Sequence, residues 1–414
     1  MNEDNIGLPT YRMNEIHNML CDVDVKKSAK VTKEEKKTFL LDDRDVLFNR
    51  TNSFEWVGRT GIYYKVENNE HIFASYLVRF VTDDSMILPE YLAAYLSSKQ
   101  GVWDIKRRAR QSINQTNVNP EEIKEIDIPL INMGLQDKIK QCFESAHKLR
   151  IDANTLLNAA EEVLLKEVGL FGFKPNSSLV NIKTYKQSFC DSGRLDAEYY
   201  QHKYDDLVNV LNKYKHGCEK FSFFIENFST GFPFRSESYV KNAGVPLIRI
   251  NNINKGTLDI TNAIQIPEAD IDLSPNDVAL ENDILISMSG TIGNSCKIPL
   301  GIKAVINQRI MRITPKNYDN EVLPLIVNSI IGNFQLNRIG TGAVQTNISS
   351  KDISEIIIPK IPEQKQRQIS RLIIEGNSCR NKSNHLLNIA KKSVEIAINE
   401  NETIALKFIT NEAS

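Results

Sequence analysis

Residues 115–129 read QTNVNPEEIKEIDIP, and residues 345–359 read QTNISSKDISEIIIP. Eight of these fifteen positions are identical without a gap, at an offset of 230 residues. Upstream, GLPTYRMNEI at residues 7–16 matches GVPLIRINNI at residues 244–253, at an offset of 237. Such a period is far longer than the roughly 20–50 residues of solenoid repeats. The sequence therefore predicts a duplicated domain, and two similar domains on one chain favour a partner that offers two similar sites.

Further motifs recur in the same order between these two anchors. DVL at residues 45–47 returns as DIL at 283–285, and SYLVR at 75–79 is echoed by QRIMR at 308–312. Runs rich in β-branched and large apolar residues predict strands at 45–50, 73–81 and 283–287. Helices are expected at 89–98 and 324–333, each with a proline in its first turn. This pattern indicates an α+β fold that is present twice.

A long helix is predicted after each QTN segment, because apolar or small residues alternate there at spacings of three and four. Each helix should span about 30 residues, or on the order of 45–50 Å. The two seams are in phase and rich in small residues, which favours an antiparallel, coiled-coil-like pair over a helix packed only on its own domain. The seam residues are Ile139, Cys142, Ala146, Leu149, Ala153, Leu156 and Ala160 in the first helix, and Ile369, Leu372, Gly376, Cys379, Ser383, Leu386 and Ala390 in the second.

These motifs divide the chain into six consecutive parts. They are a first domain at 1–134, its helix at 135–168, a polar connector at 169–193, a second domain at 194–362, its helix at 363–400 and a tail at 401–414. About fifty residues (194–243) precede the Gly-x-Pro segment in the second copy, whereas six precede it in the first. We therefore expect the first domain to lack its opening portion.

Composition excludes several classes of function. The net charge of −1 gives no global signal for nucleic acid, so any such binding must come from local patches. Six scattered cysteines without a CxxC pair favour reduced thiols and no metal site. A polar N-terminus and the absence of a long apolar run point to a cytoplasmic protein. Phosphate-loop, dinucleotide, methyltransferase and HExxH motifs are all missing, which favours a non-catalytic recognition protein.

Polar and basic residues gather in the repeated segments. Arginine and lysine can neutralise phosphates, and glutamine, asparagine and arginine can pair with base edges. Each of these segments also has a structural alternative. The basic run could be a solvated helix face, and the QTN segment could cap a turn. The repeated Arg-x-Asn motif could make hydrogen bonds within its own domain. The candidate DNA-binding residues are Arg50, Asn52, Lys106, Arg107, Arg108, Arg110, Gln115, Asn117, Arg249, Asn251, Ser289, Thr291, Arg338, Thr341, Gln345, Thr346 and Asn347.

The chain resembles the specificity subunit of type I restriction–modification systems. In the second copy the resemblance lies in RLDAEYY at 194–200, STGFPF at 229–234, VPLIRINNI at 245–253, DILIS at 283–287, GTIG at 290–293 and IPKIPEQ at 358–364. In the first copy it lies in DVLFNRTNS at 45–53 and IPL at 128–130. It covers essentially the whole chain, and the order and duplication of the motifs are more specific than any single motif.

The resemblance implies two target-recognition domains held apart by two antiparallel helices, each domain reading half of a split double-stranded DNA site. The helices would act as a ruler and dock methyltransferase subunits, expected to be two, which bind S-adenosylmethionine and methylate adenine. Restriction subunits with translocase and nuclease activity would join for cleavage, and the chain itself would bind no cofactor or metal. The first copy lacks a counterpart of residues 221–239, so a truncated or silent specificity cassette is one alternative. A helical scaffold that binds only proteins is another.

Overall fold

The computed structural model describes residues 6–66, 69–113, 115–178, 180–240, 244–261, 263–341 and 346–413. The chain divides into two compact units, the first comprising Met1–Thr155 with Gly376–Ser414 and the second comprising Leu156–Glu375. Both long helices cross this division, so each unit contains a segment of each helix. The units therefore differ from the six consecutive parts expected above, because each globular domain packs with segments of both helices.

A five-stranded sheet in the order β2-β3-β7-β5-β9 forms the centre of the first unit. Its strands are β2 (Ile16–His17), β3 (Met19–Cys21), β7 (Thr60–Ile62), β5 (Val46–Asn49) and β9 (Leu77–Phe80). Strand β5 pairs antiparallel with both β7 and β9. Because side chains alternate along a strand, Val46 and Phe48 enter the core that contains the long helices, whereas Leu47 enters a separate core on the other face.

Two smaller sheets and several helices complete the first unit. One sheet contains β4 (Ser28–Ala29), β1 (Leu8–Tyr11) and β8 (Ile72–Phe73), and the other contains β10 (Arg110–Gln111), β11 (Thr116–Asn117) and β6 (Thr51–Asn52). The short helices are η1 (Met13–Glu15), α1 (Lys33–Phe39), α2 (Pro89–Leu96), α3 (Lys99–Arg108), α4 (Pro120–Lys124) and α11 (Glu402–Glu412).

The second unit repeats the central arrangement, with the sheet order β13-β22-β19-β20 beside a second sheet of order β17-β14-β21-β18. The strands are β12 (Cys218–Lys220), β13 (Ile225–Ser229), β14 (Val245–Ile248), β15 (Ile253–Asn254), β16 (Thr257–Leu258), β17 (Gln265–Ile266), β18 (Val278–Ala279), β19 (Ile284–Ser287), β20 (Ser295–Lys297), β21 (Ala304–Ile306), β22 (Ile310–Pro315) and β23 (Ile357–Pro359). The helices are η2 (Lys186–Cys190), η3 (Ala197–Tyr200), α6 (His202–Asn212), η4 (Phe221–Phe224), η5 (Ser236–Ser238), η6 (Ile250–Asn252), η7 (Glu268–Leu273), η8 (Pro275–Asp277), α7 (Val322–Asn328), α8 (Ile330–Ile339) and α9 (Ser350–Glu355).

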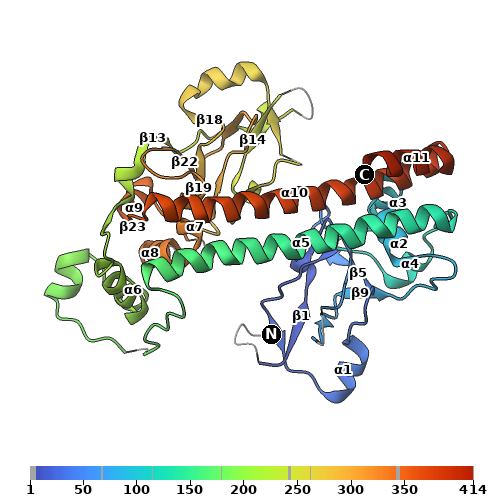
Figure 1. Ribbon diagram of the computed structural model, residues 1–414, viewed down its shortest axis with the longest axis horizontal. Coiled ribbons are helices and arrows are strands. Elements are labelled where there is room, and N and C mark those ends of the chain that lie inside the picture. The colour runs from blue at the N-terminus through green and yellow to red at the C-terminus, as the bar shows by residue number, and fades with distance from the viewer. Residues whose placement is uncertain are drawn as a thin grey trace. The chain divides into compact units, whose positions relative to one another are not determined.

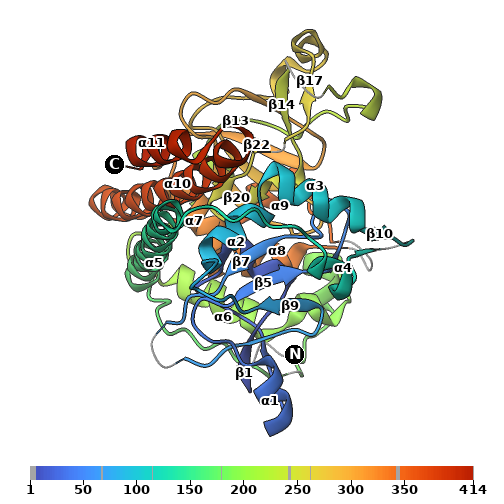
Figure 2. The same cartoon turned by 90° about the vertical axis from the view of Figure 1, so that its right-hand side faces the viewer.

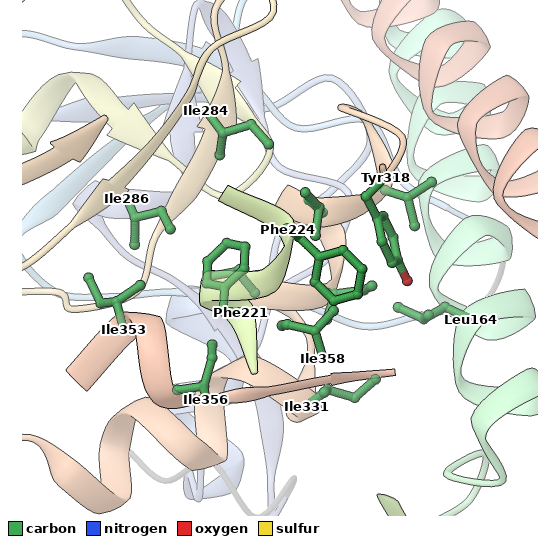
Figure 3. Close-up of a cluster of buried hydrophobic side chains, with 14 of the residues drawn as sticks. Leu164, Phe221, Phe224, Ile284, Ile286, Tyr318, Ile331, Ile353, Ile356 and Ile358 are labelled. Atoms are coloured by element: carbon green, nitrogen blue, oxygen red, sulfur yellow. The ribbon is translucent and has the colours of Figure 1, made fainter. Parts of the chain in front are cut away.

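Aromatic and branched side chains fill the core of the second unit. Ile284 and Ile286 point from β19 toward Phe221 and Phe224 of η4, as Figure 3 shows. Both phenylalanine side chains are almost fully buried. The isoleucines alternate along β19 just as Val46 and Phe48 do along β5, so the two units share one packing pattern.

The long helices α5 (Met133–Val168) and α10 (Glu363–Asn399) contain 36 and 37 residues, which is longer than expected (Figure 1). Two contacts show that these helices run antiparallel in the first unit. Ser383 Oγ donates to the carbonyl oxygen of Ala146 at 2.7 Å. Asn132, just before the start of α5, contacts Glu402, just after the end of α10. In the second unit, Ala160 of α5 shares a core with Ile369 of α10. Every predicted seam residue is buried or half-buried. Buried alanine and serine side chains allow close approach of the helix axes.

Two sequence expectations about secondary structure were wrong, and one segment without an expected element is helical. The helix expected at 324–333 is two helices, because Ser329 is extended and its hydroxyl accepts the Ile331 N–H to begin α8. The strand expected at 73–81 is divided between β8 and β9, which belong to different sheets. The tail expected at 401–414 contains α11, which buries Ala405 and Ile409 in the core of the first unit.

Candidate nucleic-acid interface

The two polar segments flagged in the first copy lie on adjacent strands. β11 pairs antiparallel with both β6 and β10, so Gln115 and Asn117 lie beside the segment of Arg50 and Asn52. Thr51 Oγ1 donates to Asn117 Oδ1 at 2.5 Å, and the Val118 N–H donates to the Arg50 carbonyl oxygen at 2.9 Å. Gln115 is exposed, whereas Arg50, Asn52 and Asn117 are half-buried. The first domain thus presents a small polar sheet with a fixed asparagine amide.

The second copy builds the same contact from a different hydroxyl. Ser289 Oγ donates to Asn347 Oδ1 at 2.7 Å, and Ser289 and Asn347 form an isolated antiparallel bridge. Asn347 also exchanges backbone hydrogen bonds with Thr341, of 2.8 and 3.1 Å. Ser289 is buried, Thr291 and Thr341 are exposed, and Thr346 is half-buried. Gln345 lies outside the described residues.

Arg309 joins this second cluster, and the sequence reasoning missed it. Its guanidinium donates through Nη1 to Asn347 Oδ1 at 2.7 Å. Because arginine can only donate, this contact identifies Oδ1 as the acceptor and directs the Asn347 amino group away from Arg309 and Ser289. Arg309 is exposed and has a φ of 69°. The repeated QRIMR segment at 308–312 contains Arg309, but a positive φ at a non-glycine residue leaves no mark in the sequence, so the contact with Asn347 could not be predicted.

Two of the predicted basic residues have internal roles. Lys106 Nζ donates to the carbonyl oxygens of Phe54, Glu55 and Val57, and thus holds the turn after β6 against α3. Burial lowers the pKa of this ammonium group. Arg108 pairs with Asp104 and donates to the carbonyl oxygen of Glu125 at 2.7 Å. The donors of these two side chains are thus used within the domain, and their contact with phosphates stays a prediction.

Arg107 lies at the end of α3 and Arg110 lies on β10, and both residues are exposed. Figure 2 shows the two elements. Their side chains are 53% and 76% exposed, although they pair with Asp104 and Glu122, respectively. Exposed ion pairs contribute only about 0–1 kcal/mol, so a phosphate can replace the carboxylate partner at little cost. These two arginines are the part of the predicted basic run that the structure leaves on the surface.

Aromatic side chains surround this basic surface and were also missed. Arg59 lies over the Trp56 ring, 3.5 Å from its centroid, and Arg107 lies 5.1 Å from the centroid of Trp103. Trp103 is 65% exposed. These are the two tryptophans of the chain, and both lie in the first domain. Trp103 lies three residues before Lys106 of the predicted basic run, which was a signal in the sequence, whereas Trp56 lies far from that run in the sequence.

Arg338, the second-copy counterpart of Arg107, is used internally. Its guanidinium pairs with Asp205 at 2.9 Å, donates to the Tyr199 carbonyl oxygen at 3.1 Å and lies over the Tyr199 ring. It therefore tethers α6 and η3 to α8 instead of reaching outward. Tyr199 and Asp205, near the start of the second domain, occupy this guanidinium, and the predicted DNA contact by Arg338 stays a prediction.

The repeated Arg-x-Asn motif forms a short turn in each copy. In the second, Asn251 is exposed and the Arg249 N–H donates to Asn252 Oδ1 at 2.8 Å. In the first, the Arg12 N–H donates to Glu15 Oε2 at 2.9 Å, and the Arg12 guanidinium pairs with the same carboxylate. Because a carboxylate replaces an amide at this position, the guanidinium of Arg12 has a charged partner in the first copy.

Metal and membrane sites find no support in the described part of the chain. No group of three or more histidine, cysteine or carboxylate side chains there could hold a metal ion. No described helix is long and apolar enough to cross a membrane. The six cysteines are unpaired, and burial raises the pKa of the Cys296 thiol to about 12, which makes it unreactive.

The architecture is a duplication, in which each of two similar α+β domains packs with segments of both long helices. A family model described as the type I restriction modification DNA specificity domain matches residues 203–374. The type I restriction enzyme MjaX specificity subunit of Methanocaldococcus jannaschii is 25% identical over 380 residues, which are 89% of this chain and 80% of that protein. The EcoAI specificity subunit of Escherichia coli is 29% identical over 182 residues, or 41% of this chain and 30% of that protein.

A crystal structure of the type I restriction–modification S subunit from M. genitalium aligns with 98% of this chain and 92% of its own, at 13% identity and a TM-score of 0.38. On the sequence matches, the chain is similar to the specificity subunits of type I restriction–modification systems.

Proposed function

We propose that this chain recognises a two-part DNA sequence as the specificity subunit of a type I restriction–modification complex. The observation that carries the proposal is the repeated hydroxyl–asparagine contact, Thr51 with Asn117 and Ser289 with Asn347. Each contact fixes an amide on a polar surface, and an amide fixed in this way can discriminate base edges. Two such surfaces on one chain fit a DNA site with two parts.

Basic side chains beside each amide supply the sequence-independent share of binding. Arg107 and Arg110 in the first domain and Arg309 in the second are exposed or more than half exposed. Contacts of this kind with phosphates release counterions and position the protein on the duplex. In this proposal the amides discriminate between bases, and the arginines provide affinity for any DNA sequence.

The chemistry of the complex belongs to its other subunits. Specificity subunits are non-catalytic, and they assemble with methyltransferase and restriction subunits on DNA. In this proposal two methyltransferase subunits bind S-adenosylmethionine and dock on the helix pair, while restriction subunits translocate and cleave. The site of action would be the cytoplasm, where cellular and invading DNA are both accessible.

A pair of matched variants tests the proposal. The complex with its methyltransferase subunits is used to select and methylate duplexes from a random pool. Thr51→Val and Ser289→Ala each remove one hydroxyl that holds an asparagine, at a stability cost of about 0.5–1.5 kcal/mol. We expect Thr51→Val to relax base preference in one part of the site and Ser289→Ala to relax it in the other. Unchanged preference in both variants would exclude the assigned surfaces.

A methylation assay completes that test. The isolated chain with S-adenosylmethionine should transfer no methyl group, and the assembled complex should. Methyl transfer by the isolated chain would contradict the non-catalytic role, and failure of the complex to select any sequence would contradict DNA recognition.

A further inference from the structure

The loop that follows β5 in the first domain is longer than its counterpart after β19 in the second. In each domain a glycine N–H closes the loop by donating to the carbonyl oxygen of the last residue of the strand, Gly58 to Asn49 at 2.8 Å and Gly293 to Ser287 at 2.9 Å. Eight residues separate the closing pair in the first domain, and five separate it in the second. The shared base therefore carries three additional residues in the first domain.

The longer loop holds an exposed aromatic ring close in sequence to the amide assigned to base recognition. Phe54 is 46% exposed, whereas residues 288–292, all of them described, expose no large apolar side chain. Thr51, three residues before Phe54, holds the Asn117 amide, and Arg110 lies opposite Asn117 in the pair of β10 with β11. The ring, the amide and the arginine therefore come from one small sheet and from the loop that leaves it.

Contacts with α3 hold this loop in place. Lys106 Nζ donates to three carbonyl oxygens of the loop, one of them that of Phe54, and lies 5.0 Å from the centroid of the Phe54 ring. At the base of the loop, a Cβ on Gly58 would lie 2.6 Å from Ile105, so the backbone packs directly on the helix. A loop fixed in this way loses less conformational entropy on binding than a free one would.

The charges near Phe54 favour a nucleic acid as the partner of this ring. Arg107, next to Lys106 on α3, and Arg110 are both exposed. Burial lowers the pKa of Lys106, and the charge of Glu55, the one carboxylate of the loop, opposes this effect. Phosphates can pair with the arginines while an apolar ring enters the base stack, so this surface suits both chemical components of DNA.

We propose that Phe54 inserts between two base pairs in the part of the DNA site that the first domain reads, and kinks the duplex there. This inference rests on the proposed function, because it describes how the first domain acts on the DNA that it binds. Apolar side chains inserted in this way unstack a base step, and pyrimidine–purine steps are the most easily kinked. The first part of the site therefore contains a TA, CA or TG step, which is selected by its deformability. The loop of the second domain leaves the other part of the site without such a kink.

The test uses the full chain assembled with its methyltransferase subunits and the duplexes that this complex selects from a random pool. We expect a pyrimidine–purine step at a fixed position in the part of the site that Thr51→Val relaxes, and a bend of about 20–90° centred on that step. Phe54→Ala should abolish the bend and the step preference, and weaken binding by at least about fivefold. Phe54→Leu, which keeps an apolar wedge, should retain the bend. Circular-permutation gel shifts measure it, and comparing variants cancels any bend that the methyltransferase subunits cause.

Phe171 offers a matched control in the second unit. Its side chain is 58% exposed, and Lys166 Nζ lies 4.7 Å from its ring centroid, much as Lys106 does at Phe54. Phe171→Ala should leave the bend, the step preference and the affinity unchanged. A selected sequence that stays straight in the complex, or a bend and step preference that survive Phe54→Ala, overturns this inference alone. Failure of the complex to select any sequence overturns the proposed function as well.

Discussion

The two domains share their interior and differ in their outer contacts. Each has an aspartate–arginine pair between equivalent strands, Asp45 with Arg79 and Asp283 with Arg312. Each also uses a glutamine at the start of its long helix, Gln136 and Gln366, to accept a backbone N–H at 2.8 Å.

At the surface the copies have diverged. The first domain has a tryptophan-bearing turn and two accessible arginines, whereas the second has Arg309 and covers its Arg338. Contacts that repeat therefore define the frame of the domain. Contacts that differ are where two domains with one frame can prefer two different DNA sequences.

The largest expected difference between the two domains is the stability lost when the aspartate of each aspartate–arginine pair is removed. Asp283→Ala should lower the free energy of unfolding by about 3–5 kcal/mol, because Arg312 is left charged and buried. Asp45→Ala should cost less, about 1–2 kcal/mol, because water can solvate the partner arginine. The Arg79 side chain is 27% exposed, against 7% for Arg312. Urea unfolding followed by domain-resolved hydrogen exchange measures both effects. Equal destabilisation would show that exposure does not separate the two pairs.

The repeated frame was largely predictable from the sequence. The duplication, the strands at Asp45 and Asp283 and the heptad seams all depend on local patterns of apolar residues, and α5 and α10 follow those seams. The division between α7 and α8 was not predictable, because it depends on Ser329 competing with an otherwise continuous helical pattern.

Site residues were harder to predict than the frame. A lysine that neutralises phosphate and one that binds turn carbonyls have the same sequence signature, so Lys106 could not be assigned without the Phe54–Val57 turn beside it. Arg338 is similar, since its partner Asp205 lies far away in the sequence. Arg309 depends on a backbone angle. Each of these cases depends on tertiary contacts that no local pattern encodes.

A second prediction tests whether equivalent glycines carry equivalent constraints. Gly58 and Gly293 both have positive φ, and a Cβ would lie 2.6 Å from Ile105 and 2.7 Å from Leu336, respectively. Gly58→Ala and Gly293→Ala should therefore each destabilise their own domain by about 1–3 kcal/mol. Thermal unfolding with domain-resolved exchange checks this expectation. If alanine is tolerated at one glycine alone, the frames are less alike than the hydrogen bonds indicate.

A third prediction separates internal from external basic residues in the first domain. Replacing Arg107 and Arg110 together by glutamine should flatten the dependence of log affinity on log salt concentration by about 0.9 for each phosphate that is no longer neutralised. Lys106→Met, the matched control, should leave that slope unchanged and lower stability, because the turn carbonyls lose their donor. Filter binding at several salt concentrations measures the slope. A flattened slope for Lys106→Met alone would reverse the assignment.

The smallest expected difference between the two domains is in how their stability depends on pH. Burial lowers the pKa of His71 and His147 below the ordinary value of 6.5, and both residues belong to the first unit. A depressed pKa means that the unfolded chain binds more protons than the folded one near pH 6, so stability rises with pH there. The first unit should accordingly lose stability as pH falls below about 6.5, and the loss should level off below the folded pKa values. His147→Phe keeps a ring against Tyr64, whose centroid lies 4.7 Å from that of His147, but cannot be protonated. Hydrogen exchange of the first unit at pH 5.5 and 7.5, corrected for intrinsic rates, should show a smaller difference in this variant than in the parent. An unchanged difference would assign the pH response to groups other than His147.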